Sequence, residues 1–243
     1  MAATPRPGPA DQAGQPPQPD REAVATRRAR RYWHRHAGNY DKKIARTERL
    51  LFADGRAWVC AQATGEVLEV AVGTGRNLGS YPAGVRLTGL DYSPAMLAVA
   101  RQRAHALGLQ VDLREGNAHA LPFADASFDT VVCTLGLCSV HDDRRAVAEL
   151  IRVLRPGGLL LLLDHVRGAT RTVRAVQWLL ELGTRRVDEF QLRRPLDQVL
   201  AGGLLVERHQ RSKLGIVERL AARKPVDAAG HPQATTAPGP DQR

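Results

Sequence analysis

An apolar run that ends in a glycine-rich turn, Gly65-Glu-Val-Leu-Glu-Val-Ala-Val-Gly-Thr-Gly-Arg-Asn-Leu78, decides the fold of this chain. Its aliphatic residues, Val67 to Val72, are typical of a strand that is covered on both faces. Gly73 and Gly75 then indicate a turn in which the backbone bends sharply or approaches a ligand. Glu69 lies inside the apolar run, where an unpaired charge is costly, so we expect a bound ligand or a nearby backbone amine to satisfy it. The turn alone is a weak signal, because Gly-x-Gly is common between strands and helices.

The length and composition are those of an ordinary globular protein. With 243 residues, 43% of them hydrophobic and 25% charged, the chain suits one domain with a substantial core. No apolar run approaches the roughly 18 residues of a membrane span. The N-terminus lacks the pattern of an export signal, so we expect a cytoplasmic protein. Cys60, Cys133 and Cys138 lie in apolar surroundings without CxxC spacing, which predicts buried, reduced thiols.

The formal net charge is +10, and much of it lies between residues 27 and 49. A basic segment of this kind can contact nucleic acid or an anionic membrane surface. It is more typical of a solvated helix in an arginine-rich protein, and no base-stacking aromatic motif accompanies it. We therefore expect no nucleic-acid partner. Peripheral contact with an anionic membrane through this N-terminal helix stays open, as does the oligomeric state.

Strands and helices alternate after the glycine turn. The pattern predicts strands over residues 85–90, 111–114, 128–135, 159–163, 204–211 and 217–222, and helices over 94–108, 142–154, 173–182 and 196–200. Such alternation predicts an α/β fold, namely a Rossmann-like, seven-stranded, mostly parallel sheet with helices on both faces and an antiparallel last strand.

The remaining segments define the domain boundaries. Residues 1–20 and 224–243 are rich in Pro, Ala and Gly and lack apolar periodicity, so we expect disordered tails. Residues 21–63 predict a helical lid with a break between its two helices at residues 37–41. Residues 64–223 form the main domain.

The glycine turn and Asp91 are predicted to share one crevice, since ligands bind outside the carboxyl ends of the strands in an open parallel sheet. Asp91 follows Gly73 by 18 residues, close to the spacing at which an acid reaches ribose hydroxyls. The alternative for Asp91 is an interaction with the dipole of the following helix. NAD normally requires a third glycine for its diphosphate, but Leu78 occupies that position and Pro82 ends the helix behind it. A nucleoside cofactor without phosphate therefore fits better.

A set of motifs, taken together, resembles class I S-adenosylmethionine-dependent methyltransferases. The motifs are Glu69-x-x-x-Gly73-x-Gly75, Asp91-Tyr-Ser-Pro-x-Met96, Gly116-Asn-Ala-x-x-Leu-Pro-Phe123, Ser127-Phe-Asp129 and Leu154-Arg-Pro-Gly-Gly158. The similarity is greatest to the branch that contains ubiquinone/menaquinone methyltransferases and bacterial phosphatidylethanolamine N-methyltransferases. It extends over residues 32–223.

The resemblance implies S-adenosylmethionine as the cofactor and a set of residues that bind it. These are Tyr40, Glu69, Gly73, Gly75, Asp91, Tyr92, Met96, Asn117, Ala118 and Leu135. Glu69 and the two glycines would lie along the methionine part, Asp91 would accept hydrogen bonds from the ribose, and Tyr92 or Met96 would pack on adenine.

The other implied positions carry small departures from the family. Asn117 and Ala118 lie where the family usually has Asp-Ala, and the Asn oxygen can still accept a hydrogen bond from adenine. Ala71 replaces the usual first glycine, a change that its methyl group can make harmless. Tyr40 would belong to the lid and Leu135 would border the site of methyl transfer.

Methyl transfer requires an aligned nucleophile and a site that excludes water. A general base is needed only where the nucleophile carries a proton. His141 and His165 are the candidate bases, with Asp164 as a further candidate, although a lone histidine is more often an ordinary polar residue. No His/Cys cluster has zinc spacing, so we expect no metal.

The acceptor is expected to be small and lipophilic: a lipid, a quinone or a natural product. Apolar residues are predicted to line its pocket, although core packing explains them equally well: Val173, Val176, Trp178, Leu179, Leu180 and Leu182. The alternative functions are an NAD-dependent oxidoreductase and a non-catalytic, basic nucleic-acid-binding protein.

Overall fold

A computed structural model describes residues 21–185 and 189–226 of the chain. The predicted N-terminal tail, and the predicted C-terminal tail after Val226, lie outside the described residues. The helices are α1 (Arg21–Leu51), α2 (Gly55–Cys60), α3 (Pro94–Ala106), α4 (Asp143–Val153), α5 (Arg171–Thr184) and α6 (Pro195–Ala201), with short 3-10 helices η1 (Leu78–Ser80) and η2 (Leu137–Ser139). The strands are β1 (Glu66–Val70), β2 (Arg86–Asp91), β3 (Asp112–Glu115), β4 (Phe128–Thr134), β5 (Leu154–His165), β6 (Leu205–Ser212) and β7 (Val217–Arg223).

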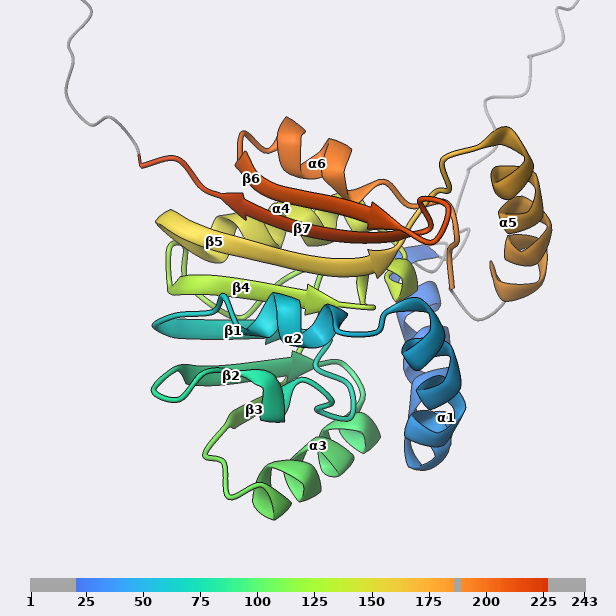
Figure 1. Cartoon of the computed structure of the whole chain (residues 1–243). Coiled ribbons are helices and arrows are strands. Elements are labelled where there is room, and N and C mark those ends of the chain that lie inside the picture. Colours follow the sequence, from blue (N-terminus) through green and yellow to red (C-terminus); the bar gives the residue numbers. More distant parts are fainter. Residues whose placement is uncertain (1–20, 186–188, 227–243) are drawn as a thin grey trace, which may run out of the picture.

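The strands form one seven-stranded sheet in the order β3-β2-β1-β4-β5-β7-β6. Strands β1 to β5 pair in parallel, whereas β7 is antiparallel to both β5 and β6. The predicted fold class is therefore confirmed, including the final hairpin. Strand order reverses between β1 and β4, and the carboxyl ends of these strands point toward α1 and α5 (Figure 1).

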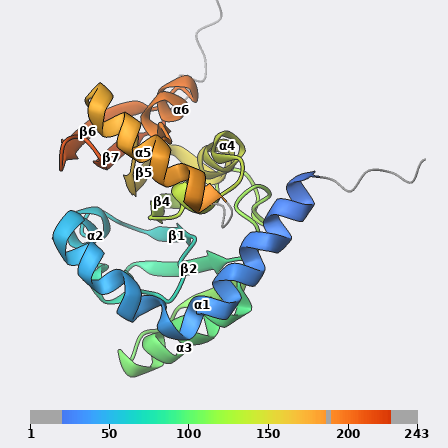
Figure 2. The same ribbon diagram turned by 90° about the vertical axis from the view of Figure 1, so that its right-hand side faces the viewer.

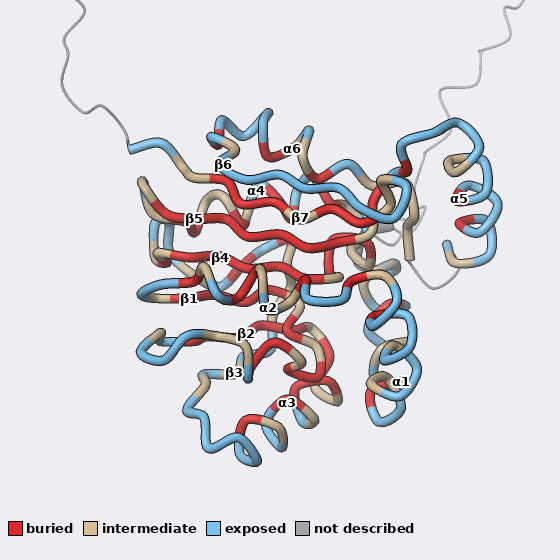
Figure 3. Tube along the Cα trace, in the orientation of Figure 1, coloured by how far each residue is buried: buried red, intermediate tan, exposed pale blue. Residues whose placement is uncertain are grey.

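Alternate side chains of the central strands bury two separate cores, as the period of a strand requires. Leu160 and Leu162 of β5 lie in one core with α4 and Val199 of α6. Leu161 of the same strand lies in the other core with residues of α2 and α3. Buried residues follow these strands through the middle of the molecule, whereas most residues of α1 and α5 are exposed or partly exposed (Figure 3).

The predicted break at residues 37–41 is wrong, because α1 is one continuous helix of 31 residues. Gly38 costs a helix only about 1 kcal/mol relative to alanine. Contacts of Asp41 with Thr74 and Arg103 hold the helix in place beyond the glycine. The second predicted lid helix is correspondingly shorter, and α2 begins only at Gly55.

Strand β5 begins earlier than predicted, at Leu154, and so includes the Pro156-Gly157-Gly158 segment. The pairing of β4 with β5 shifts register between Phe128 and Thr130, which accommodates these residues as an irregularity. Among the described residues, no helix is both long and apolar enough to cross a membrane.

Candidate cofactor site

A cleft of about 910 Å³, including space open to solvent, lies at the carboxyl ends of β1, β2 and β4. Figure 2 looks onto this edge of the sheet, where α1 crosses the strand ends. The lining residues come from α1, α2, the glycine turn, and the segments that follow β2, β3 and β4: Thr26, Ala29, Trp33, Tyr40, Arg56, Val70, Ala71, Val72, Gly73, Thr74, Arg76, Leu90, Asp91, Tyr92, Met96, Gly116, Asn117, Ala118, His119, Thr134, Leu135, Gly136, Ser139, Val140 and His141.

Asp91 is the buried carboxylate of this cleft. Its Oδ2 accepts a hydrogen bond of 2.9 Å from the amide of Gly73, and its Oδ1 accepts one of 2.8 Å from the amide of Ser93. Burial raises the pKa of Asp91 to about 6, and these two backbone hydrogen bonds only partly oppose the shift. Each oxygen keeps a second acceptor position, so the ionised carboxylate can receive two hydroxyl donors.

The glycine turn places open space next to Asp91. Gly73 has φ +55°, and a Cβ there would meet no protein atom closer than Ala71 O at 3.9 Å, so it would project into the cleft. Ala71 has φ +59°, a left-handed conformation that costs an L-residue about 1–2 kcal/mol. Its methyl group fits in the space available, but the backbone at this position is strained. The replacement of the family's first glycine by alanine is therefore not the harmless change that the sequence had suggested, but carries this conformational cost.

Glu69 is satisfied by protein side chains. Its carboxylate accepts hydrogen bonds from Asn77 Nδ2 at 2.8 Å and from Tyr81 OH at 2.9 Å. Burial raises the pKa of Glu69 to about 7, although Tyr81, Asn77 and the nearby charge of Arg56 act to lower it. The expected ligand or backbone partner is thus replaced by an asparagine and a tyrosine from the segment after the turn.

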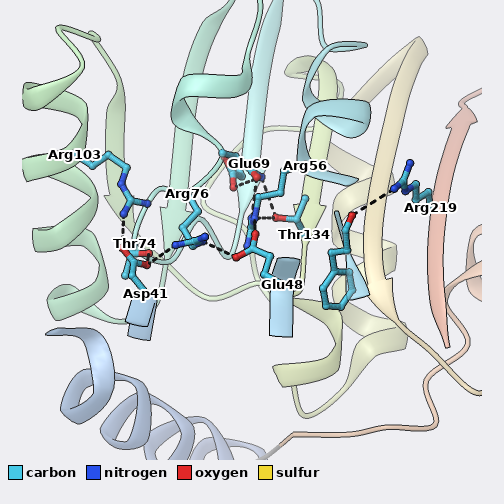
Figure 4. Close-up of polar contacts among 11 residues, drawn as sticks. Asp41, Glu48, Arg56, Glu69, Thr74, Arg76, Arg103, Thr134 and Arg219 are labelled. Atoms are coloured by element: carbon cyan, nitrogen blue, oxygen red, sulfur yellow. Dashed lines mark hydrogen bonds and ion pairs between the residues drawn. The ribbon is translucent and has the colours of Figure 1, made fainter. Parts of the chain in front are cut away.

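Charged side chains fasten α1 to the glycine turn (Figure 4). Asp41 accepts a hydrogen bond of 2.7 Å from the Thr74 hydroxyl and forms an ion pair with Arg103 of α3. Burial raises the pKa of Asp41, but the Thr74 hydrogen bond and the Arg103 charge outweigh it, so the net pKa is lowered. About two turns further along α1, Glu48 pairs with Arg56 and lies 2.7 Å from Arg76 Nε. These contacts hold α1 as a wall of the cleft.

Aromatic side chains of α1 contribute to the same wall. Trp33 and Tyr40 pack edge to face with ring centroids 5.7 Å apart. Burial raises the pKa of Tyr40 well above its usual range, which keeps the phenol protonated. The sequence reasoning missed Trp33, Ala29 and Thr26, because the break assigned at residues 37–41 hid their common helical face. Their spacing of three, four and seven residues up to Tyr40 is the signal that could have found them.

Nine of the predicted site residues line the cleft: Tyr40, Gly73, Asp91, Tyr92, Met96, Asn117, Ala118, Leu135 and His141. Glu69, Gly75 and His165 are not among its lining residues. Gly75 serves packing, since a Cβ there would lie 2.7 Å from Leu78 Cδ1. The cleft is also lined by Arg56, Arg76 and His119, which were not predicted. A lone arginine or histidine in a sequence does not indicate that its side chain lines a cleft.

The three residues Cys138, Asp164 and His165 lie together behind the cleft, with potential ligand atoms within 4.8 Å of one another. Both Asp164 oxygens already accept backbone hydrogen bonds, from Cys138 at 3.1 Å and from His165 at 2.8 Å. Burial raises the pKa of Asp164 and, more strongly, that of the Cys138 thiol. A protonated thiol and an engaged carboxylate make this cluster a connection between β5 and η2. The three cysteines are buried and free, as predicted.

The predicted apolar lining from residues 173–182 is wrong. Val176, Trp178, Leu179, Leu180 and Leu182 of α5 are exposed, and none of them lines the cleft. The helix turns its polar residues Gln177 and Glu181 inward instead. A mean apolar composition cannot reveal which side of a helix faces the protein.

An open α/β sheet, a glycine turn after β1 and a buried acid at the end of β2 form the kind of crevice in which such sheets bind nucleosides. Residues 68–162 match the family described as a methyltransferase domain. The chain is 42% identical over 106 residues to demethylmenaquinone methyltransferase from Thermus thermophilus, covering 42% of this chain and 48% of that protein. It is 43% identical over 103 residues to phosphatidylethanolamine N-methyltransferase from Cereibacter sphaeroides, covering 42% of this chain and 51% of that protein.

The fold has a solved counterpart in an S-adenosylmethionine-dependent methyltransferase from Thermotoga maritima. The TM-score is 0.60 at 22% identity, over 79% of this chain and 98% of that one, so the likeness concerns the fold. The resemblance predicted from the sequence is confirmed: residues 68–162 match a methyltransferase domain, and the relatives that share 42–43% identity with the chain are named as methyltransferases. The chain spans about half the length of the curated relatives it matches.

Proposed function

We propose that this chain transfers a methyl group from S-adenosylmethionine to a small, lipophilic acceptor. The observation that supports the proposal most is the buried carboxylate of Asp91, held by the amides of Gly73 and Ser93 in the cleft of a methyltransferase domain. Its remaining acceptor positions suit a pair of ribose hydroxyls. The pair of hydrogen bonds to this charged group would contribute about 1.5–3 kcal/mol to binding.

The residues of the cleft fit the cofactor in further ways. Gly73 leaves room for close approach of a ligand to the backbone, and Met96 and Tyr92 offer apolar surface beside Asp91. S-adenosylmethionine supplies a methyl group activated by its positively charged sulfur. The chain's own task is to hold the two reactants in line and to exclude water, which the wall formed by Trp33 and Tyr40 favours.

His141 is the candidate base where the acceptor carries a proton. It lines the cleft, whereas His165 does not, and its own backbone carbonyl is held by Arg193 at 3.0 Å. The carbonyl contact fixes the loop and leaves the ring available. We therefore narrow the base assignment to His141.

A lipophilic acceptor is favoured by the apolar side chains among the residues that line the cleft, which include Trp33, Leu135 and Val140. The two relatives described above act, by their names, on a quinone and on a phospholipid. The basic residues exposed along α1, among them Arg27, Arg31 and Arg35, favour peripheral contact with an anionic membrane on the cytoplasmic side.

Calorimetric titration with S-adenosylmethionine and, separately, with NADH tests the proposal. We expect saturable binding of the first ligand only, since the position of a third glycine is taken by Leu78. Turnover is then measured as S-adenosylhomocysteine released in the presence of a demethylated quinone, phosphatidylethanolamine or a phenolic natural product. Binding of NADH without S-adenosylmethionine would overturn the proposal.

A further inference from the structure

Helix α5 presents a contiguous apolar surface to solvent. This surface, called the α5 face below, consists of Val176, Trp178, Leu179, Leu180 and Leu182, which are 49–65% exposed. Single exposed apolar residues are ordinary, but a contiguous patch with an exposed tryptophan indicates an interaction site. The other exposed large apolar residues of the described chain lie outside α5.

The outward direction of the α5 face is fixed by the polar residues on the inner side of the helix. Gln177 is buried, accepts a hydrogen bond of 2.7 Å from the Gly168 amide and donates one of 2.8 Å to the Val166 carbonyl. Glu181, four residues on and therefore on the same side, accepts from the amides of Gln191 and Leu192 at 2.8 and 3.1 Å. Rotating the helix to bury its leucines would leave these buried polar groups unpaired.

Basic residues border the α5 face. Arg171 and Arg185 are exposed at its two ends. The β6–β7 hairpin adjoins the start of the helix through the hydrogen bond of 3.0 Å from the Ala169 amide to the Leu214 carbonyl. This hairpin adds the exposed side chains of Lys213 and Leu214. Glu181 is the acidic residue of α5, and it is buried.

We propose that the α5 face docks on an anionic lipid membrane. An apolar helix face that carries tryptophan and leucine between basic residues is what binds at the interface of such a membrane. A second copy of the chain would bring two basic borders together in a protein of net charge +10. Residues 1–20 and 227–243 offer no apolar cover, since Met1 is their sole large apolar residue.

The docked orientation would direct the cleft toward the lipid. Helices α1 and α5 lie on the same side of the sheet, beyond the strand ends (Figures 1 and 2). The segment after α5 is joined to the loop that lines the cleft, because the Phe190 amide donates to the Cys138 carbonyl at 2.8 Å and Arg193 donates to the His141 carbonyl. Delivery of a lipophilic acceptor along this route rests on the proposed function, whereas docking itself does not.

Vesicle binding tests docking directly. The full chain is mixed with vesicles of phosphatidylcholine alone or of phosphatidylcholine with phosphatidylglycerol, and binding is followed by flotation and by the blue shift of tryptophan fluorescence. We expect binding to the anionic vesicles only. The double variant Leu179→Gln/Leu182→Gln should bind them at least about tenfold more weakly, since two leucines no longer enter the lipid.

The matched control is Leu107→Gln/Leu205→Gln. Leu205 and Leu107 are 63% and 49% exposed, against 65% and 49% for Leu179 and Leu182, and they lie on other elements of the protein. The control should bind vesicles like the unchanged chain. Equal vesicle affinity of the two double variants would overturn the proposal, as would the absence of anionic-vesicle binding by the unchanged chain.

Two further measurements separate this proposal from the proposed function and from self-association. The affinity for S-adenosylmethionine, measured without vesicles, should be the same in both double variants. If the unchanged chain did not bind S-adenosylmethionine, that result would contradict the methyltransferase proposal and leave membrane docking untouched. Light scattering should give the same mass for the unchanged chain and for Leu179→Gln/Leu182→Gln. A dimer that this variant dissociates would assign the α5 face to a second copy and overturn membrane docking.

Discussion

The two ends of the carboxyl edge of the sheet bury polar side chains with opposite results. At the β1–β2 end, Glu69 and Asp91 are buried against side chains and amides next to an open cleft. At the α5 end, Gln177 and Glu181 are buried against backbone groups, and the apolar side of the helix is left exposed. The first arrangement places the carboxylate of Asp91 at the cleft. The second fixes the direction of an apolar surface.

The difference teaches that burial of a polar residue does not by itself indicate a ligand site. The two ends differ in what lies next to the buried polar residue. Asp91 borders a cleft, whereas Gln177 hydrogen-bonds to the chain segments before and after α5. Substitutions at the two ends should therefore affect different measurements.

The largest effect is expected from Glu69→Gln on stability as a function of pH. Because burial raises the pKa of Glu69 from 4.5 to about 7, the folded state holds a proton that the unfolded state releases between these values. The stabilisation from this proton is complete below pH 4.5 and is lost as pH rises through 7. Glutamine is neutral throughout, so the variant should gain up to about 3 kcal/mol over the unchanged chain by pH 8.

Urea unfolding at several pH values from 4.5 to 8 measures this difference. Glu66→Gln is the control, since Glu66 is partly exposed on the same strand. Parallel stability curves for Glu69→Gln and the unchanged chain would contradict the raised pKa.

Asp91→Ala should lower the affinity for S-adenosylmethionine by about 10- to 100-fold, because two hydrogen bonds to a charged acceptor are lost. Asp112→Ala removes an exposed aspartate of β3 that pairs with Arg114, and it should leave the affinity unchanged. Calorimetry on both variants, with melting temperatures to verify folding, checks the ribose assignment. An affinity of Asp91→Ala within a factor of two of the unchanged chain would exclude it.

Gln177→Leu should destabilise the protein by roughly 2 kcal/mol, because the Gly168 amide and the Val166 carbonyl lose their buried partner. Affinity for S-adenosylmethionine at a temperature well below unfolding should stay the same. Gln198→Leu, on α6, provides a comparison at a partly buried glutamine whose partner is the side chain of Asp143. A loss of cofactor affinity in Gln177→Leu without loss of stability would place the α5 end in the cofactor site.

Cofactor affinity should fall by up to about tenfold for each unit of pH below 6. Burial raises the pKa of Asp91 to about 6, and protonation removes acceptor positions from the carboxyl group, so binding weakens as pH falls through that value. The same titration on Asp91→Ala should be flat over this range. A pH dependence that survives in the variant would assign the titration to another group.

The smallest effect is expected at the α5 face in the absence of lipid. Leu179→Gln/Leu182→Gln should change the free energy of unfolding by less than about 0.5 kcal/mol, since the side chains are exposed. Val199→Gln, at a fully buried position of α6, should destabilise strongly in the same urea assay. A large destabilisation by the leucine substitutions would mean that the α5 face packs on the protein.

The sheet and the cleft beside the glycine turn were predictable from sequence because their signals are local. The apolar runs predict the strands and Gly73 predicts the turn. The spacing from Gly73 to Asp91 predicts that the turn and the acid lie together, and the Gly73 amide does donate to Asp91. The rotation of α5 was not predictable, because it depends on hydrogen bonds from Gln177 and Glu181 to segments outside the helix. The contacts of Asp41 with Arg103, which keep α1 continuous, join residues 62 positions apart, and composition carries no trace of them.

Strand β7 has a practical consequence for attaching the protein to a surface. Since β7 runs antiparallel to β5, its last residue, Arg223, lies at the edge of the sheet opposite to α1 and α5 (Figure 1). Lys224 continues there, where its amide donates to the Gly158 carbonyl at 3.0 Å. A sensor chip coupled beyond this point would hold the molecule by its rear edge. Cofactor, acceptor and vesicles could then all approach from the solution side.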